Sequence, residues 1–161
     1  MKKVISILMG SDSDLEVVSE AIKLLKEFNV GFEVKVLSAH RCPKELAKYV
    51  EEAPSKGTKI FIAAAGGAAA LAGVIASHTT LPVIGIPIET KSLKGLDSLL
   101  STVQMPSGVP VASMAIGKAG AKNAAIFALQ ILGTSDKKIN SKLIAYKSNL
   151  RLRAIKTKIK L

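Results

Sequence analysis

The sequence has little of several residue types that would indicate other classes of protein. It contains one cysteine, no tryptophan and only six aromatic side chains in 161 residues. One cysteine, Cys42, excludes an internal disulfide framework and is typical of a reducing compartment. No run approaches the roughly 20 apolar residues that a membrane-spanning helix needs, and residues 1–3 lead into a strand pattern without the features of a signal peptide. We therefore expect a cytoplasmic protein with no membrane partner.

The positive charge is concentrated at one end of the chain. The net charge of +11 would suit a nucleic-acid-binding protein. However, residues 136–161 hold nine Lys or Arg and one acid, Asp136, which leaves only +3 for residues 1–135. Few aromatic rings are available for base stacking. We expect one α/β domain over residues 1–135, a basic helical extension of it over 136–161, and no nucleic-acid partner.

Strand and helix patterns alternate along the chain. The patterns predict strands over 4–9, 32–37, 59–64, 82–86 and 109–116. They predict helices over 14–28, from Pro43 to Gly57, over 119–132 and over 136–158, and a small-residue helix that follows the turn after the third strand and ends at about residue 77. Strands joined by helices run parallel, and the helices cover both faces of the sheet. The sequence thus predicts a three-layer α/β sandwich with a central parallel sheet, flavodoxin-like or Rossmann-like, plus a C-terminal helix. In such sheets the ligand lies beyond the carboxyl ends of the strands.

Two loops at predicted strand ends carry candidate functional residues. Ser11, Ser13 and Asp14 follow the first strand, where hydroxyls and free N–H groups can hold an anion; the alternative is an ordinary N-cap turn. Ser38, Ala39, His40 and Arg41 follow the second strand. Arg binds phosphate or carboxylate through its rigid fork, and His transfers protons readily near neutral pH. The alternative for this loop is a surface histidine and arginine at a helix start.

Other residues near these loops have structural interpretations. Cys42 is expected to be a packed thiol rather than a nucleophile, since no second histidine lies close to it in the sequence. His78 precedes the fourth strand and is expected on the side away from the site. His40 and His78 are far apart, and no acidic cluster joins them, so we expect neither a metal nor an organic cofactor.

The third and fourth loops are rich in glycine or in turn residues. Gly66 and Gly67 begin a Gly/Ala turn after the third strand, where glycine allows a ligand to approach the backbone; close helix packing is the alternative. The turn is neither a dinucleotide-binding fingerprint nor a P-loop. Residues 95–110 are polar, contain Pro and Gly, and are expected to shape a pocket wall.

Taken in order, these loops resemble the PurE family of phosphoribosylaminoimidazole carboxylases and mutases. The similar segments run from Val4 to Leu132, and they are Met9-Gly10-Ser11-Asp12-Ser13-Asp14, Ser38-Ala39-His40-Arg41, Ala65-Gly66-Gly67-Ala68-Ala69, Asp97-Ser98-Leu99-Leu100-Ser101 and Val103-Gln104-Met105-Pro106-Ser107-Gly108. The resemblance implies a phosphate loop at the first motif, catalysis by His40, and substrate contacts at Ser11, Asp14 and Arg41. The third motif resembles the loop that binds the base.

The resemblance also favours one reaction class over another. Class I members usually carry SAHR and a Gly-Gly pair, as here, and rearrange N5-carboxyaminoimidazole ribonucleotide to its 4-carboxy isomer. Class II members usually carry SAHK and Arg-Ser, and carboxylate aminoimidazole ribonucleotide with carbon dioxide. Class I members typically read Gly-Gly-Ala-Ala-His-Leu where this chain has Ala70 in the histidine's place. Ala70 thus removes an imidazole that would line the pocket.

Three further expectations concern partners and rival functions. The small-residue segments 62–76 and 119–128, with an apolar stripe on the C-terminal helix, favour a homo-oligomer, and the resemblance implies an octamer. The alternative is a monomer whose tail folds on its own surface. Besides the class II carboxylase, the rival functions are a non-catalytic nucleotide-binding module, which would have no use for His40, and a nucleic-acid-binding protein that relies on the tail.

Overall fold

The computed structural model describes residues 2–157. Its centre is a parallel sheet with the strand order β2-β1-β3-β4-β5. The strands are β1 (Ile5–Met9), β2 (Phe32–Val36), β3 (Ile60–Gly66), β4 (Val83–Ile88) and β5 (Ala112–Ser113). This order is that of flavodoxin-like sheets, in which the chain leaves β1 for one side and returns through β3 to the other. The predicted fold class is therefore confirmed.

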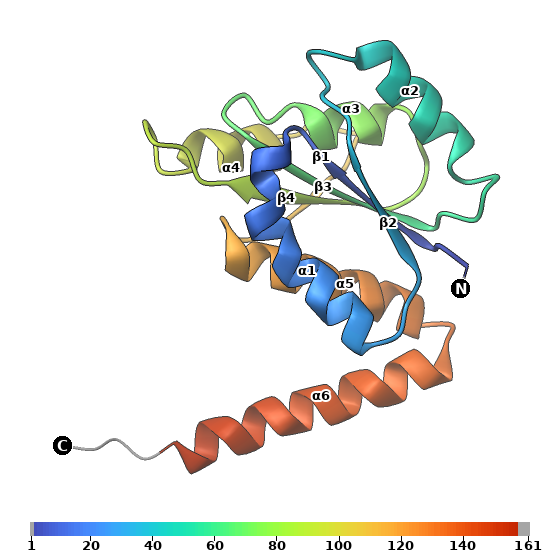
Figure 1. Cartoon of the computed structure of the whole chain (residues 1–161), viewed down its shortest axis with the longest axis vertical. Coiled ribbons are helices and arrows are strands. Elements are labelled where there is room, and N and C mark those ends of the chain that lie inside the picture. The colour runs from blue at the N-terminus through green and yellow to red at the C-terminus, as the bar shows by residue number, and fades with distance from the viewer. Residues whose placement is uncertain (1, 158–161) are drawn as a thin grey trace. The chain divides into compact units, whose positions relative to one another are not determined.

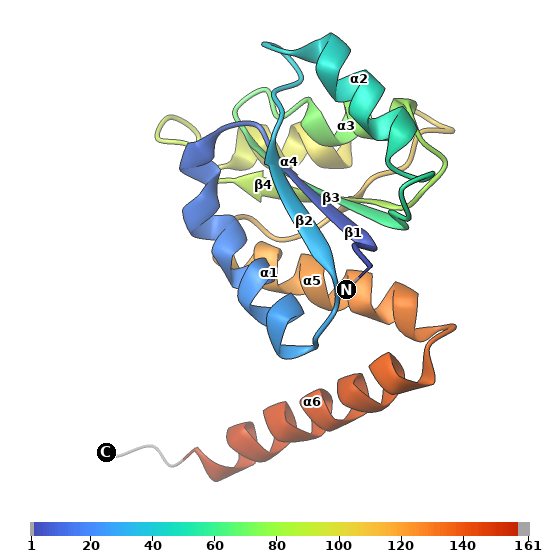
Figure 2. The same cartoon turned by 45° about the vertical axis from the view of Figure 1, so that its right-hand side comes forward.

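Helices cover both faces of the sheet. They are the short 3-10 helix η1 (Asp12–Asp14) and the α-helices α1 (Leu15–Glu27), α2 (Pro43–Glu52), α3 (Leu71–Ser77), α4 (Leu96–Val103), α5 (Lys118–Gly133) and α6 (Lys137–Lys156). Figures 1 and 2 show α1 and the first part of α5 on one face, and α2, α3 and α4 on the other. The chain forms two units that divide within α5, between Ile126 and Phe127.

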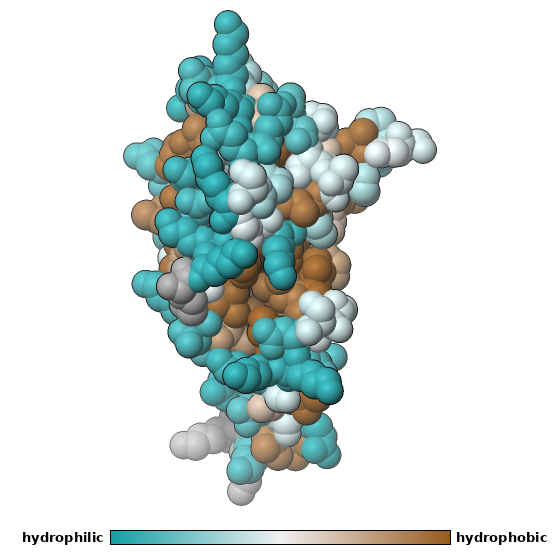
Figure 3. Space-filling view, turned by 90° about the vertical axis from the view of Figure 1, so that its right-hand side faces the viewer, coloured by the Kyte–Doolittle hydropathy of each residue, from teal (hydrophilic) through white to brown (hydrophobic). Residues whose placement is uncertain are grey.

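The core of the first unit lies on the sheet. All five residues of β1 and the first six of β3 are buried, as expected for inner strands that helices cover on both faces. On one face, Leu46 and Val50 of α2 and Ile75 of α3 are fully buried around Phe61 of β3. The outer surface of α2 carries charged residues, and hydrophilic side chains gather at the top of Figure 3, where α2 lies. This apolar inner stripe holds α2 in place above the end of β2.

Three predicted elements differ from the structure by more than two residues at one end. The helix expected from Pro43 to Gly57 ends at Glu52, because Pro54 has no N–H with which to continue it. The strand expected over 109–116 is reduced to Ala112–Ser113 at the sheet edge. Residues 96–103, which were expected to be a loop, form α4.

The second unit contains the basic helix. Its first turn is capped by Asp136, whose carboxylate accepts hydrogen bonds from the backbone N–H groups of Lys138 and Ile139 (2.8 and 3.2 Å). Leu143 is the buried residue of α6, and Leu150 is exposed. The predicted helix over 136–158 is thus confirmed to Lys156, and position 158 lies outside the described residues. Over residues 2–157, no helix is long and apolar enough to cross a membrane.

Candidate active site

The register of the sheet brings four strand ends to one edge. Met9 pairs with Val36 on one side and Ala64 on the other, and Ala64 pairs with Ile86. The loops that follow β1, β2, β3 and β4 surround a cavity of about 440 Å³, within the usual size range of small-molecule pockets. The residues that line it are Gly10, Ser11, Ser13, Asp14, Ser38, Ala39, His40, Arg41, Ala65, Gly66, Ala69, Ala70, Leu71, Ile88 and Glu89. The cavity lies where a flavodoxin-like sheet binds its ligand.

Seven of the eight predicted site residues meet at this cavity. They are Ser11, Ser13, Asp14, Ser38, His40, Arg41 and Gly66. The eighth, Gly67, is not among the lining residues, and its N–H donates instead to the hydroxyl of Ser98 (3.0 Å). The loops that the sequence singled out thus lie around one cavity, although the sequence did not show which way the Gly66-Gly67 pair turns.

The loop after β1 is held by a reciprocal set of hydrogen bonds. The Ser11 N–H donates to the Asp14 carboxylate (3.2 Å), and the Ser13 N–H donates to the Ser11 hydroxyl (3.4 Å), which forms a capping box at the start of η1. Asp14 is only 7% exposed. Burial raises the pKa of its carboxyl, and the hydrogen bonds from Ser11, Ser13 and Gly10 lower it in part. A desolvated carboxylate in this position can bind ligand hydroxyl groups strongly, since water competes poorly for it.

The loop after β2 is shaped by Ser38 and Cys42. The Arg41 N–H donates to the Ser38 hydroxyl (3.3 Å), while the Cys42 thiol donates to the Ser38 carbonyl (3.2 Å) and accepts from the Ser38 N–H (3.1 Å). Because the Cys42 thiol makes hydrogen bonds that shape the loop, these contacts favour a structural role for Cys42 over a role as a nucleophile. They leave the exposed side chains of His40 and Arg41 beside the cavity.

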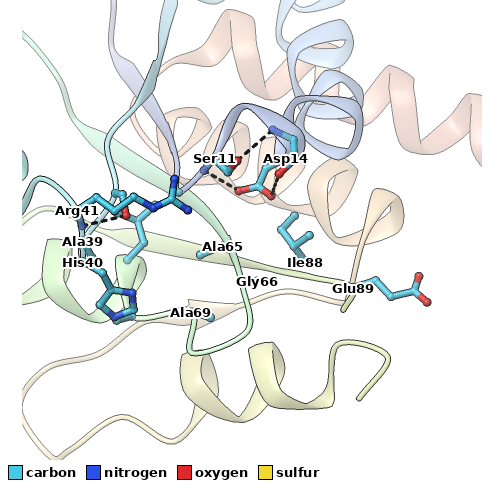
Figure 4. Close-up of a pocket in the computed structure, with 15 residues that line it drawn as sticks. Ser11, Asp14, Ala39, His40, Arg41, Ala65, Gly66, Ala69, Ile88 and Glu89 are labelled. Carbon is cyan, nitrogen blue, oxygen red and sulfur yellow. Dashed lines mark hydrogen bonds between the residues drawn. The ribbon is translucent and has the colours of Figure 1, made fainter. Parts of the chain in front are cut away.

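The cavity has chemically different sides. Figure 4 shows His40 and Arg41 on one side, Ser11 and Asp14 on the other, and Gly66 between them. The Arg41 side chain extends toward the Ser11 side. The arrangement offers a guanidinium and hydroxyls for an anion, a carboxylate for hydroxyl groups, and an imidazole for proton transfer.

The loop after β3 lies close to the end of β4. Gly66 pairs with Ile88, and a Cβ on Gly66 would lie 3.4 Å from the Ile88 Cβ, which is tight for a larger residue. Gly67 and Ala69 both have left-handed backbones, with φ of +69° and +37°. Left-handed geometry costs an alanine roughly 1–2 kcal/mol, so this turn is held by its surroundings.

The sequence missed Ile88 and Glu89 as lining residues. Both lie beyond residue 86, where the fourth strand was predicted to end, and β4 in fact continues to Ile88. Figure 4 shows the Glu89 carboxylate pointing away from the other labelled residues. Glu89 is the first residue after β4, so a strand predicted to end at Ile88 rather than at residue 86 would have pointed to it.

Two other expectations have different outcomes. Residues 95–110 are not among the lining residues, which corrects their assignment as a pocket wall. Their α4 lies behind the wall and contacts it through Ser98. His78 lies away from the cavity, as expected, with its Nδ1 3.0 Å from the Glu51 carboxylate. In the described part of the chain, no group of three His, Cys, Asp or Glu side chains could hold a metal ion.

Known proteins resemble this chain over nearly its whole length. The profile of the AIR carboxylase family matches residues 4–152. A Pyrococcus horikoshii protein named N5-carboxyaminoimidazole ribonucleotide mutase is 53% identical over 93% of this chain and 84% of its own length. A Saccharolobus solfataricus protein of the same name is 48% identical over 96% and 97%. The crystal structure of Treponema denticola PurE has a TM-score of 0.86, with 28% identity over 95% of this chain and 94% of that one. The chain therefore belongs to the AIR carboxylase, or PurE, family.

Proposed function

We propose that this chain is a mutase of purine biosynthesis that interconverts N5-carboxyaminoimidazole ribonucleotide and 4-carboxy-5-aminoimidazole ribonucleotide. The proposal rests mainly on the cavity, where His40 and Arg41 face Ser11 and Asp14. Family membership adds support, since relatives at about half identity carry the mutase name. The class II carboxylase reaction is not favoured.

The two sides of the cavity suggest how the nucleotide lies. Its 5′-phosphate is placed on Ser11, Ser13 and Arg41, which offer N–H and O–H donors and a permanent positive charge. The Asp14 carboxylate accepts hydrogen bonds from ribose hydroxyls. The imidazole ring then lies beside Gly66, within reach of His40.

The reaction requires one proton to be given and one to be taken. Loss of the N5 carboxylate breaks the N–C bond, leaves the electron pair on nitrogen and releases carbon dioxide beside the ring. His40 protonates that nitrogen. Carbon 4, which the amino group makes nucleophilic, then attacks carbon dioxide, and His40 removes the carbon 4 proton to restore aromaticity. His40 gives one proton and takes one back, so it ends the cycle in its starting form. We therefore expect turnover without added metal or organic cofactor.

One assay separates the proposed reaction from its rivals. The purified chain is given either the N5-carboxylated nucleotide or aminoimidazole ribonucleotide with bicarbonate, and formation of the 4-carboxy product is followed. A mutase converts the first substrate at low bicarbonate. Conversion of the second mixture alone would show a class II carboxylase, and binding without conversion of either would show a nucleotide-binding module.

Ala70 provides a prediction about the efficiency of this site. It lines the cavity and is partly exposed, so an imidazole placed there by Ala70→His would add a second group that binds protons. We expect a higher rate or an altered pH profile of kcat. Ala68→His is the matched control, because Ala68 is exposed in the same turn but is not among the lining residues. If both variants behave like the parent protein, position 70 has no part in catalysis.

We also infer that the chain assembles into a homo-octamer. The alanines expected at subunit contacts are already buried in the chain's own core, among them Ala72, Ala121 and Ala125. Exposed apolar side chains lie instead on and near α4, where Leu93, Leu96, Leu100 and Val103 are each 46–56% exposed, and others lie on α6, among them Ile144 and Ile155. An apolar patch of this kind commonly marks an interface, and a closed symmetric assembly would cover it.

Light scattering at micromolar concentration tests the assembly. The chain has a mass of 16.9 kDa, and the octamer is expected at eight times that mass. A second measurement on Leu96→Glu with Leu100→Glu tests the surface, since two charges on α4 should shift the protein to smaller species. A parent protein that scatters as a monomer would contradict the proposal.

A further inference from the structure

One buried side chain outside the cavity connects two of its walls. Ser98, in the first turn of α4, is completely buried. Its hydroxyl donates to the carbonyl of Ile88 (2.7 Å) and accepts from the N–H of Gly67 (3.0 Å). Ile88 lines the cavity, and Gly67 directly follows Gly66, which also lines it. One hydroxyl thus joins the loop after β3 to the end of β4.

The start of α4 is itself fixed against the same wall. The Thr90 hydroxyl donates to the Asp97 carboxylate (2.9 Å) and accepts from the Gly95 N–H (3.4 Å). Gly95 has φ of +87°, and a Cβ there would lie 3.2 Å from the Glu89 Cα, so a side chain would push α4 away from the cavity wall. These contacts place Ser98 firmly and make its hydroxyl a fixed point for the turn.

The turn needs such a fixed point. The turn has left-handed residues at Gly67 and Ala69, and it closes with one backbone hydrogen bond, from the Ala69 N–H to the Gly66 carbonyl (3.3 Å). Its Gly67 side faces open space, with no atom within 4 Å of a Cβ placed there. Packing on that side therefore does not hold the turn. The Ser98 hydroxyl uses its one proton on Ile88 and a lone pair on Gly67, and alanine would leave both of these backbone groups without that partner.

We propose that Ser98 is a positioning residue, which holds the turn over residues 66–69 against the end of β4 and so places the surface on which the imidazole ring of the substrate lies. The role of that surface in catalysis rests on the proposed function. The tie, meaning the two hydrogen bonds from the Ser98 hydroxyl to Gly67 and Ile88, does not depend on it. Because misplacement of a substrate by about 1 Å can reduce a rate by 10²-fold, the tie should matter for the chemical step. Phosphate binding, on the far loops, should be affected much less.

The test compares Ser98→Ala with two control variants on the same helix. Thr102→Val removes another buried hydroxyl of α4, which bonds to the Ser113 hydroxyl (2.8 Å) and to the carbonyls of Ser98 and Leu99 (3.1 and 3.0 Å), none of which lines the cavity. Ser101→Ala removes an exposed hydroxyl, which donates to the Asp97 carbonyl (2.9 Å). Thr102→Val measures the effect of losing a buried hydroxyl of α4 that does not contact the cavity wall. Ser101→Ala measures the effect of losing an exposed hydroxyl of the same helix.

The expected result is a split between the kinetic constants. Ser98→Ala should lower kcat by roughly 10- to 100-fold while KM changes by less than about threefold, and Thr102→Val should keep both near the parent values. Hydrogen exchange at the Gly67 amide should be faster in Ser98→Ala and unchanged in Thr102→Val. Ser98→Cys, which keeps a weak donor and acceptor, should recover part of both losses and serves if the alanine variant does not fold.

Two results would overturn the inference. One is a Ser98→Ala protein whose kcat matches that of Thr102→Val, and the other is unchanged exchange at Gly67. The exchange measurement needs no substrate, so it tests the tie even if the parent protein fails the mutase assay. Failure of that assay would refute the proposed function and leave the exchange result to decide whether Ser98 fixes the turn.

Discussion

His40→Asn is expected to reduce turnover by at least a hundredfold and to leave nucleotide binding within about tenfold, or ~1.4 kcal/mol. General acid–base catalysis contributes about 10²- to 10⁴-fold, and here one imidazole performs two proton transfers. Asparagine keeps a polar side chain of similar size but does not exchange protons near neutral pH. The hydrogen bonds that shape the loop come from Ser38, Arg41 and Cys42, so the substitution should not unfold it.

The other histidine of the chain is the matched control for this result. His78 contacts Glu51, between the end of α3 and α2, and it is not among the residues that line the cavity. His78→Asn should keep kcat and KM near the parent values, because an exposed contact between two polar side chains contributes little. Turnover is measured under saturating substrate, and binding by titration with the product. Near-normal turnover of His40→Asn would rule out the mechanism, whatever His78→Asn does.

Most of the fold could be predicted because its strands are plain in the sequence. Buried parallel strands are nearly continuous runs of apolar residues, and β1, β3 and β4 are such runs apart from Ser6 in β1. The alternation of these runs with helical patterns was enough to give a parallel sheet. The strand order and the exact edge strand were not predictable, since they depend on which neighbours pair in space. The two-residue β5 shows this limit, because it has almost no pattern of its own.

The sequence could not show α4, for a reason specific to that helix. Its buried residues are Ser98 and Thr102, while Leu96, Leu100 and Val103 are exposed. The usual amphipathic pattern, with apolar residues inside and polar residues outside, is therefore reversed in α4. The polar residues are tolerated inside because their hydroxyls have partners, such as Ser113 for Thr102 and Ile88 for Ser98. The same inversion concealed Ser98 as a residue behind the cavity.

The candidate site was more predictable than α4 because it follows from a rule of the fold. Once the strands were predicted, the rule that ligands bind beyond their carboxyl ends pointed to the loops there. Seven residues predicted from these loops line one cavity in the structure. The eighth, Gly67, does not line the cavity, and the sequence could not show this, because the direction of the left-handed turn depends on its partner, Ser98. The assignment of a role to each residue stays a prediction that the variants are designed to test.

Arg41→Ala is expected to weaken binding of the phosphorylated nucleotide by about 10- to 150-fold, and binding of the corresponding nucleoside hardly at all. A hydrogen bond to a charged group is worth roughly 1.5–3 kcal/mol, which corresponds to that range of affinity. The Arg41 side chain is exposed and extends toward the Ser11 side of the cavity, where the phosphate is placed. Its backbone N–H, which donates to the Ser38 hydroxyl, is kept in the variant, so the loop should retain its shape.

Lys44→Ala separates a direct bond to phosphate from a general effect of positive charge. Lys44 lies in the first turn of α2, three residues after Arg41, and is exposed without lining the cavity. The variant also loses one positive charge from this part of the chain but breaks no contact at the site, and salt screens the effect of such a charge over about 8–10 Å. Isothermal titration of both variants with the nucleotide and the nucleoside gives four affinities. Equal losses for the two ligands in Arg41→Ala would place the guanidinium elsewhere on the ligand. Equal losses of nucleotide affinity in the two variants would show that Arg41 acts through the field alone.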